Sequence, residues 1–226
     1  MKRCRSTLRT KMSRLISVHV AKAGGTSLLK SLREAYGDRF LAHYDDNPAD
    51  PRSERWLAPK RHFSGARTIA TGIECVHGHF HPGLWEADRT TIFSTLLRDP
   101  VQNVISIYFF WKGAAAPFDP LHEYVLKNSL SLLEVADLPI VRDLYHRTYF
   151  ESFDMRRFSL IGNHDDRAAF YSRLSRITGR ALDADVHENI TPPSEERRAF
   201  ESDPKAMRAL RDILRQDVKF FEKWAR

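Results

Sequence analysis

The sequence predicts a single α/β domain in which helices flank a P-loop-like parallel sheet. Short apolar runs end at polar or glycine-containing turns, and amphipathic segments follow them. The length of 226 residues is enough for one sizeable core but short for two full domains. We therefore expect one domain over residues 15–226, preceded by a basic tail over residues 1–14.

The first expected unit is a strand, a tight loop and a helix. Residues 15–20 form an apolar run with β-branched side chains, which is typical of a buried strand. The small residues 21–25 then form a turn, and the helix that follows has Leu28 and Leu32 on one apolar face. Gly37 is placed to end this helix.

Two further apolar runs, residues 68–76 and 91–97, predict parallel strands that end at polar residues. Asp99 followed by Pro100 is a helix start, because Asp caps free amides and proline at the first helical position loses no hydrogen bond. Residues 40–66 lack periodicity and are expected to be a surface connection with one helical turn. The other expected elements are helices over 100–111, 120–127, 131–135, 140–149, 165–178 and 194–224, the last bent near Pro204, and a strand over 157–161.

Composition favours anionic partners. Lys and Arg outnumber Asp and Glu by 36 to 29, and the net charge of +7 suits a phosphorylated cofactor, an acidic polysaccharide or nucleic acid. No apolar run is long enough to cross a bilayer. Cys4 and Cys75 form neither a disulfide framework nor a metal-binding spacing, and Cys75 is expected to be a small buried residue. We expect a soluble, cytoplasmic protein with no metal site and no stable membrane insertion.

The strongest chemical signal is the segment Val-Ala-Lys-Ala-Gly-Gly-Thr-Ser over residues 20–27. Glycines let the backbone approach an anion, the helix amides and dipole favour negative charge, and Lys22 adds a point charge. The usual nucleotide triphosphate loop, GxxxxGK[ST], is absent, because Lys22 precedes both glycines. Because Pro100 follows it, we interpret Asp99 as a helix cap rather than a magnesium ligand, which disfavours a kinase.

Three segments resemble the sulfotransferases that use 3'-phosphoadenosine 5'-phosphosulfate (PAPS), specifically the carbohydrate group that includes the uronosyl 2-O-sulfotransferases. Residues 19–27 are similar to the family's 5'-phosphosulfate loop, commonly His-x-Pro-Lys-x-Gly-Gly-Thr-Ser, with Ala21 in place of proline. Residues 97–108 resemble its 3'-phosphate segment, and residues 76–80 resemble its His-Gly-His segment. The resemblance implies PAPS as cofactor, 3',5'-adenosine bisphosphate as product and a hydroxyl-bearing acceptor, with a saccharide as the expected class.

The resemblance also implies roles for individual residues. Arg98 and Ser106 would hold the 3'-phosphate. His79 would be the catalytic base and His77 would orient or assist it, while His81 stays open as an alternative base. With an unperturbed imidazole, the rate would rise with pH through a limb near about 6.5. The residues expected to bind the 5' side of the cofactor are Lys22, Ala23, Gly24, Gly25, Thr26 and Ser27, of which Lys22 is also catalytic.

The sequence alone leaves two alternatives to a sulfotransferase. An atypical P-loop kinase is one, and a basic nucleic-acid-binding module with Arg-rich stretches at 52–67 and 197–215 is another. The acceptor-side walls are expected in segments 40–66 and 114–149. The cations that would suit an anionic sugar are Lys112, Arg142, His146 and Arg147.

The segment around residues 189–194 has two interpretations. Asn189, Thr191 and Ser194 either belong to a loop that covers the nucleotide, or lead into a helix that Ser194 caps.

Overall fold

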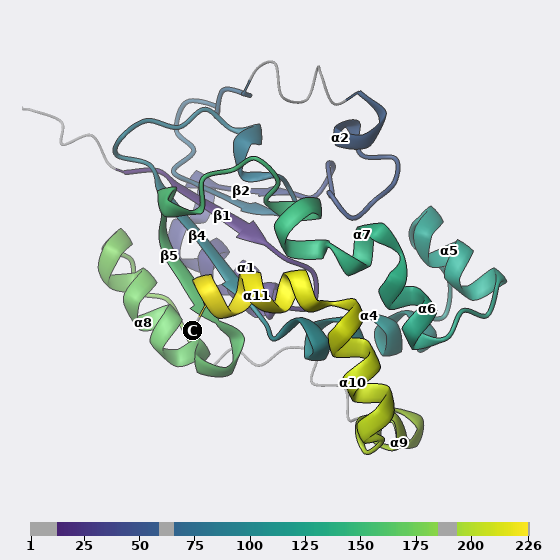
Figure 1. Ribbon diagram of the computed structural model, residues 1–226. Coiled ribbons are helices and arrows are strands. Elements are labelled where there is room, and N and C mark those ends of the chain that lie inside the picture. Colours follow the sequence, from purple (N-terminus) through teal and green to yellow (C-terminus); the bar gives the residue numbers. More distant parts are fainter. Residues whose placement is uncertain (1–12, 59–65, 185–193, 226) are drawn as a thin grey trace, which may run out of the picture.

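The computed structural model of the protein describes residues 13–58, 66–184 and 194–225. Within these ranges, one five-stranded sheet with the order β2-β3-β1-β4-β5 is parallel throughout (Figure 1). The strands are β1 (Leu15–His19), β2 (Phe40–His43), β3 (Cys75–Gly78), β4 (Ile92–Leu97) and β5 (Phe158–Asn163). The predicted single α/β domain with a parallel sheet and flanking helices is confirmed. The expected tail boundary stays a prediction, because residues 1–12 lie outside the described residues.

Helices α1 (Gly25–Tyr36) and α8 (Arg167–Thr178) cover one face of the sheet. Leu28 and Leu32 of α1, one turn apart, are almost fully buried against this face, as the apolar spacing predicts. Burial of each such side chain stabilises the fold by about 1.5–3 kcal/mol. Cys75 lies in the same layer and is fully buried, which confirms it as a small core residue; burial raises the pKa of its thiol.

Helices α4 (Pro100–Lys112) and α11 (Arg215–Trp224) lie on the other side of the sheet, and α6 (Leu132–Asp137) and α10 (Pro204–Ile213) pack against α4 (Figure 1). Asp99 caps α4 by accepting hydrogen bonds from the N–H groups of Val101 and Gln102, so its predicted capping role is confirmed. The shorter helices are α2 (Glu54–Leu57), α5 (Pro120–Lys127), α7 (Pro139–Arg142) and α9 (Glu195–Glu201), and the 3-10 turns are Gly37–Arg39, Pro82–Leu84, Met155–Arg157 and His164–Asp166.

Two strand predictions need correction. Strand β2 was expected to be irregular; it is a four-residue edge strand, only partly buried, and lacks an apolar run that would reveal it. Strand β3 begins at Cys75 rather than at residue 68, because Gly72 has φ 93° and Ile73 donates to the Ala70 carbonyl in a turn. The strand therefore includes His77 and Gly78.

Two helix predictions also need correction. The single helix expected over residues 140–149 is α7 followed by a π-helix, Leu144–Tyr149, because the buried carboxylate of Asp217 accepts from the N–H groups of Tyr145 and His146. The helix expected over 194–224 is three helices. It breaks before Pro204, as predicted, and again at Leu214.

Gly78 is required by the close approach of β2 to β3. A Cβ at this position would lie 1.7 Å from the backbone oxygen of His43, which the paired strand cannot move aside easily. We predict that Gly78→Ala destabilises the protein by more than about 3 kcal/mol, beyond the usual cost of overpacking.

The matched control is Gly72→Ala, where the added methyl meets open space and only the positive φ is strained. That control should cost about 1–2 kcal/mol. Equal losses for the two variants in urea unfolding would contradict the steric account.

Candidate active site

The loop between β1 and α1 has the shape of an anion-binding turn. Lys22 has φ 58° and Gly24 has φ 85°, so the chain turns sharply before α1 begins at Gly25. Among the described residues, no side chain caps the helix and its first turn contains no acidic residue. Free amides and the positive end of the helix dipole therefore favour a bound anion here.

Three contacts fix this loop against the sheet. Asn103 of α4, fully buried, donates from Nδ2 to the Ala21 carbonyl at 2.9 Å. The Gly25 carbonyl accepts from His77 Nε2 at 3.3 Å. A Cβ at residue 25 would lie 1.9 Å from Cδ2 of His19, so only glycine fits beneath this ring. Sequence analysis gave Asn103 no role, because a buried amide has no local sequence signal.

Three cations crowd the loop. Burial lowers the pKa of Lys22, and Arg98 and Arg197 lower it further. Burial and Arg197 likewise lower the pKa of Arg98. Within the described part of the chain, neither the Lys22 ammonium nor the Arg98 guanidinium has a hydrogen bond or ion pair, whereas Arg197 pairs with Glu201 at 3.1 Å. An anion among these cations would relieve their mutual repulsion.

One face of α4 lines the same region. Phe110 lies under Lys22, whose Nζ is 4.0 Å from the ring centroid. Ser106 is one turn before Phe110 and three residues after Asn103, which reaches the loop, so Ser106 shares this face. The structure thus brings Lys22, Arg98 and the Ser106 position to one side of the loop.

Two further basic residues lie beside Gly24. A Cβ at residue 24 would be 3.1 Å from Cδ2 of His164 and 3.5 Å from Cδ of Arg167. Burial lowers the pKa of the His164 imidazole, and nearby Arg98 and Arg167 lower it further. Sequence analysis missed both residues, because the resemblance that singled out Arg98 gave these two no role.

A stack of three histidines adjoins the loop where β1 and β3 end. The His19 ring lies between those of His77 and His79, with ring centroids 5.2 Å and 4.2 Å away. Nδ1 of His19 is 3.0 Å from the Tyr44 hydroxyl. Burial, then His79, His77 and Lys22, lower the pKa of His19. All three imidazoles are therefore neutral at pH 7.

His77 has no nitrogen free for catalysis. Its Nε2–H donates to the Gly25 carbonyl, so its Nδ1 accepts from the Ser17 hydroxyl at 2.9 Å. The side chain is fully buried, and burial lowers its pKa to about 3. Its position is that of a residue that holds the loop to the sheet.

His79 is arranged differently. Its Nδ1 lies 2.6 Å from the His19 carbonyl, which can only accept, so Nδ1 carries the proton and Nε2 keeps its lone pair. Burial lowers the pKa of His79 to about 4, against the opposing effect of that hydrogen bond. The side chain is only partly buried. A neutral, oriented imidazole with a free Nε2 is the form that a general base requires.

His81, the alternative base, has a structural position, and Glu86, a carboxylate later in the same segment, is too exposed to be a strong candidate. His81 accepts from the Gly83 N–H at 3.1 Å and its Nε2 lies 2.9 Å from the Glu151 carbonyl, so both of its nitrogens are engaged. Glu86 is exposed, next to the isolated bridge between Arg67 and Trp85.

The π-helix connects the histidine to the Arg98 side of the site. The hydroxyl oxygen of Tyr149 lies 3.1 Å from His79 Nδ1, and that of Tyr145 donates to the Arg98 carbonyl at 2.7 Å. Asp217 holds the start of the π-helix through backbone amides, with His146 Nδ1 also 2.7 Å from it. This bond raises the pKa of His146. Sequence analysis missed this arrangement, because Asp217 lies 72 residues from Tyr145.

The segment before α9 is described only from Ser194. Ser194 accepts from the Arg197 N–H at 3.1 Å, which supports its interpretation as a helix cap. Asn189 and Thr191 lie outside the described residues. Arg197 of this helix nevertheless reaches the cation cluster.

Over the described ranges, no group of three or more His, Cys, Asp and Glu side chains is arranged to hold a metal ion. No helix in those ranges combines the length and the apolar character needed to cross a membrane.

Comparison with known proteins finds similarity in fold but not in sequence. No protein-family model matches the sequence. No curated protein matches it either. The structure is similar to the crystal structure of a sulfotransferase from Alicyclobacillus acidocaldarius, with a TM-score of 0.41 and 14% identity over 92% of this chain and 96% of that one. A similarity this low does not assign a function, so the function has to be argued from the site itself.

The buried imidazoles predict acid sensitivity of the fold. Burial holds the pKa of His77 at about 3 and of His79 at about 4, whereas an imidazole of the unfolded chain titrates near 6.5. Between these values the unfolded chain binds protons that the folded chain excludes. Stability is therefore full above about pH 6.5 and falls as the pH drops toward 4, by up to about 1.4 kcal/mol per pH unit for each imidazole.

Urea unfolding at several pH values across this window measures the effect. The variant His79→Gln should show a shallower decline than the wild type, because one titrating group is gone. Parallel declines for both proteins would contradict the assigned pKa of His79.

Proposed function

We propose that the protein is a cytoplasmic sulfotransferase that moves a sulfuryl group from PAPS to a hydroxyl of a saccharide. The observation that carries this proposal is the combination of two nearby cations, Lys22 before α1 and Arg98 before α4, with the neutral imidazole of His79. Within the described residues neither cation has a hydrogen bond or ion pair. The cations suit an anionic donor, and the imidazole suits a hydroxyl acceptor. No metal ligand is needed for either role.

The residues present fit a nucleotide with separate 5' and 3' anionic groups. The loop residues Lys22, Ala23, Gly24, Gly25, Thr26 and Ser27 would hold the 5'-phosphosulfate. Arg98, with Ser106 on the facing side of α4, would hold the 3'-phosphate. Crowded cations are unfavourable without an anion, which is the physical reason that the cluster fits a bisphosphorylated ligand.

In this mechanism His79 Nε2 takes the proton of the acceptor hydroxyl while the hydroxyl oxygen bonds to sulfur. PAPS supplies the sulfuryl group, and the bond from sulfur to the bridging oxygen breaks. The His19 carbonyl holds the Nδ1 proton, so the ring keeps one orientation through the transfer. Lys22 and the amides of the loop stabilise the charge that develops on the leaving oxygen. His77 supports the reaction by fixing the loop rather than by exchanging protons.

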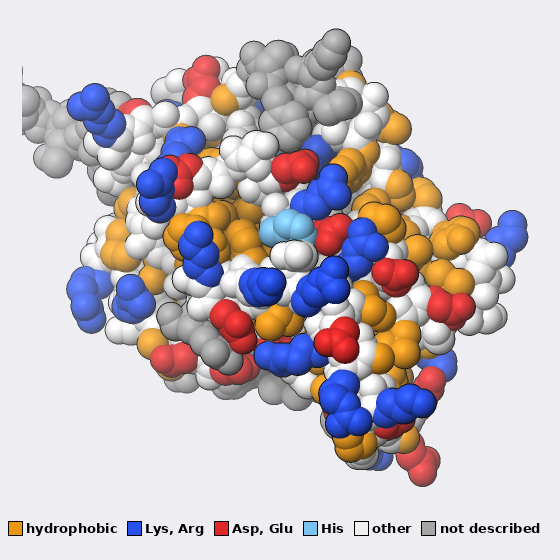
Figure 2. Space-filling model, in the orientation of Figure 1, with side chains coloured by type: hydrophobic (Ala, Val, Ile, Leu, Met, Phe, Trp, Pro, Cys, Tyr) orange, Lys and Arg blue, Asp and Glu red, His pale blue; other side chains and the backbone are white. Residues whose placement is uncertain are grey.

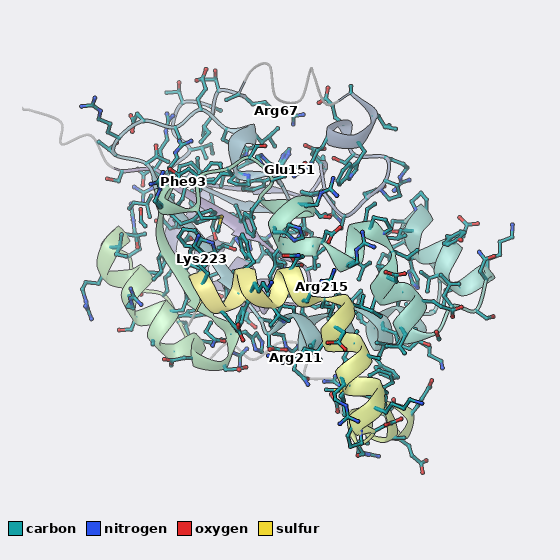
Figure 3. All side chains as sticks on the ribbon, in the orientation of Figure 1. Arg67, Phe93, Glu151, Arg211, Arg215 and Lys223 are labelled. Atoms are coloured by element: carbon teal, nitrogen blue, oxygen red, sulfur yellow. The ribbon has the colours of Figure 1, made fainter. Side chains whose placement is uncertain are left out.

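The two alternative functions have weaker support. A kinase would need a carboxylate for magnesium near the loop, but Asp99 is used as the α4 cap. A nucleic-acid-binding module would need a continuous basic surface. On the face shown in Figures 2 and 3, basic side chains along α10 and α11 are interspersed with acidic ones, and Arg211 pairs with Glu222 at 3.6 Å.

The assignment of the 3'-phosphate predicts selective loss of binding. Arg98→Ala and Ser106→Ala should each weaken 3',5'-adenosine bisphosphate by about tenfold or more, because a charge-assisted hydrogen bond is lost. Both variants should bind adenosine 5'-phosphate almost as the wild type does. Calorimetry with the two ligands decides the matter, and equal losses for both would show that these residues serve the 5' side or the fold.

The assignment of the base predicts a large effect on turnover alone. His79→Ala should keep its affinity for 3',5'-adenosine bisphosphate and lose at least about a hundredfold in the rate of PAPS-dependent sulfation of a mixed saccharide acceptor. Exposed Glu86→Ala is the control and should keep its rate. The base is misassigned if His79→Ala keeps its rate while His81→Ala or Glu86→Ala loses it.

The burial of His79 changes the pH profile expected for the rate. Since the pKa of His79 is lowered to about 4, the acid limb of kcat/KM, which reports the free enzyme, should lie near that value rather than near 6.5. The limb of kcat should lie higher, because a bound anion beside the imidazole favours its protonated form.

A further inference from the structure

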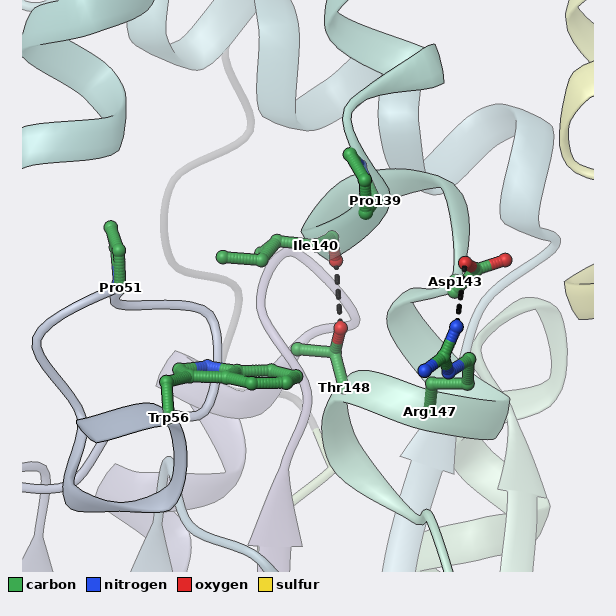
Figure 4. A pocket seen from close by; sticks show the side chains of 7 residues that line it. All are labelled: Pro51, Trp56, Pro139, Ile140, Asp143, Arg147 and Thr148. Carbon is green, nitrogen blue, oxygen red and sulfur yellow. Dashed lines mark hydrogen bonds and ion pairs between the residues drawn. The ribbon is translucent and has the colours of Figure 1, made fainter. Parts of the chain in front are cut away.

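A pocket of about 330 Å³ lies between two segments that are far apart in the sequence (Figure 4). One wall comes from the connection that includes α2, and the other from α7 and the π-helix. These are parts of the two segments expected to form the acceptor-side walls. The lining residues are Pro51, Trp56, Pro139, Ile140, Asp143, Arg147 and Thr148.

A buried arginine ties the two walls together. Arg55 is 2% exposed, and its guanidinium donates to the Thr148 carbonyl at 2.6 Å, to the Arg147 carbonyl and to Glu151 at 3.2 Å. A buried charge is tolerated when its hydrogen bonds are satisfied, and removing its partners is costly. The separation of the walls is therefore fixed before any ligand arrives, so the pocket is preformed.

The floor of the pocket is an aromatic platform. Trp56 is 37% exposed, and its Nε1–H donates to the Pro48 carbonyl at 2.7 Å, which fixes the plane of the indole. Figure 4 shows this ring along one side of the pocket, with Ile140 across from it and Thr148 next to the end of the ring. The available surface is mainly apolar, and an apolar face of a ligand ring would cover the indole.

Polar groups occupy one edge of this platform. Arg147 and Asp143 approach to 4.0 Å, so a donor and an acceptor stand side by side. Of the other cations considered for an anionic sugar, Lys112 pairs with Glu196 and His146 with Asp217, away from the pocket lining. At the pocket edge Arg142 pairs with Asp143 at 3.2 Å, and Arg147 also pairs with Glu151 at 3.5 Å. A sugar ring has an apolar C–H face and a rim of hydroxyls that both donate and accept. A flat aromatic alcohol has only one such hydroxyl.

The pocket adjoins the histidine site. Thr148 lines it, and the hydroxyl of the next residue, Tyr149, lies 3.1 Å from His79 Nδ1. We propose that the pocket binds one sugar ring of an oligosaccharide acceptor, stacked on Trp56, while a neighbouring ring presents its hydroxyl to His79. This inference rests on the proposed function and assigns its acceptor class as an oligosaccharide.

Calorimetry with three probes tests this proposal: a tetrasaccharide of alternating glucuronic acid and N-acetylglucosamine, cellotetraose, and 2-naphthol. At least one tetrasaccharide should bind the wild type, and Trp56→Ala should weaken it by about three- to tenfold. Trp56→Phe should retain most of the affinity because it keeps a ring. Leu57→Ala, at an exposed neighbour that does not line the pocket, is the matched control and should bind normally.

Binding of 3',5'-adenosine bisphosphate distinguishes a failure of the pocket assignment from a failure of the proposed function. Its affinity should be the same in Trp56→Ala as in the wild type, which also verifies folding. Failure of both tetrasaccharides to bind, Trp56-dependent binding of 2-naphthol alone, or equal saccharide affinity in Trp56→Ala would overturn the pocket assignment. If the wild type does not bind 3',5'-adenosine bisphosphate, the proposed function is overturned, whether or not a saccharide binds.

Discussion

The site depends on the pair of hydrogen bonds that His77 makes at the centre of the sheet. Through Ser17 and Gly25 this one side chain joins β3 to β1 and to the first residue of α1, so the anion-binding turn has one shape. Burial keeps the imidazole neutral, and a neutral ring can donate with one nitrogen and accept with the other. A protonated His77 would have to donate from both nitrogens, which reverses the Ser17 bond, and would place a charge in the core.

Two opposite electrostatic environments lie near that turn, at the ends of the neighbouring strands β1 and β3. Around Lys22, cations repel one another, which prepares the loop for an anion. At His79, burial holds the imidazole neutral, which prepares it to accept a proton. The π-helix connects the two, because Tyr145 fixes the Arg98 backbone and Tyr149 contacts His79. A π-helix is rare in proteins, but those that occur are often at functional sites. Here the buried carboxylate of Asp217 stabilises its first turn.

The parts of the site that sequence predicted are those with a local cause. The turn before α1 follows from its glycines, and the start of α4 follows from Asp99 and Pro100. The parts that were missed depend on distant contacts. Strand β2 is too short and exposed to have a pattern of its own, and the π-helix exists because Asp217 reaches it from α11. Which nitrogen of His79 is free depends on the His19 carbonyl, a contact that no local pattern reveals.

The central claim is that the cations around Lys22 and Arg98 form a site for a nucleotide with separate 5' and 3' anionic groups. A thermal-shift comparison of three ligands tests it most directly, because a ligand that binds only the folded state raises the unfolding temperature. The account predicts that 3',5'-adenosine bisphosphate stabilises the protein far more than ATP with magnesium or duplex DNA. A larger shift with ATP and magnesium, or with DNA, would contradict it.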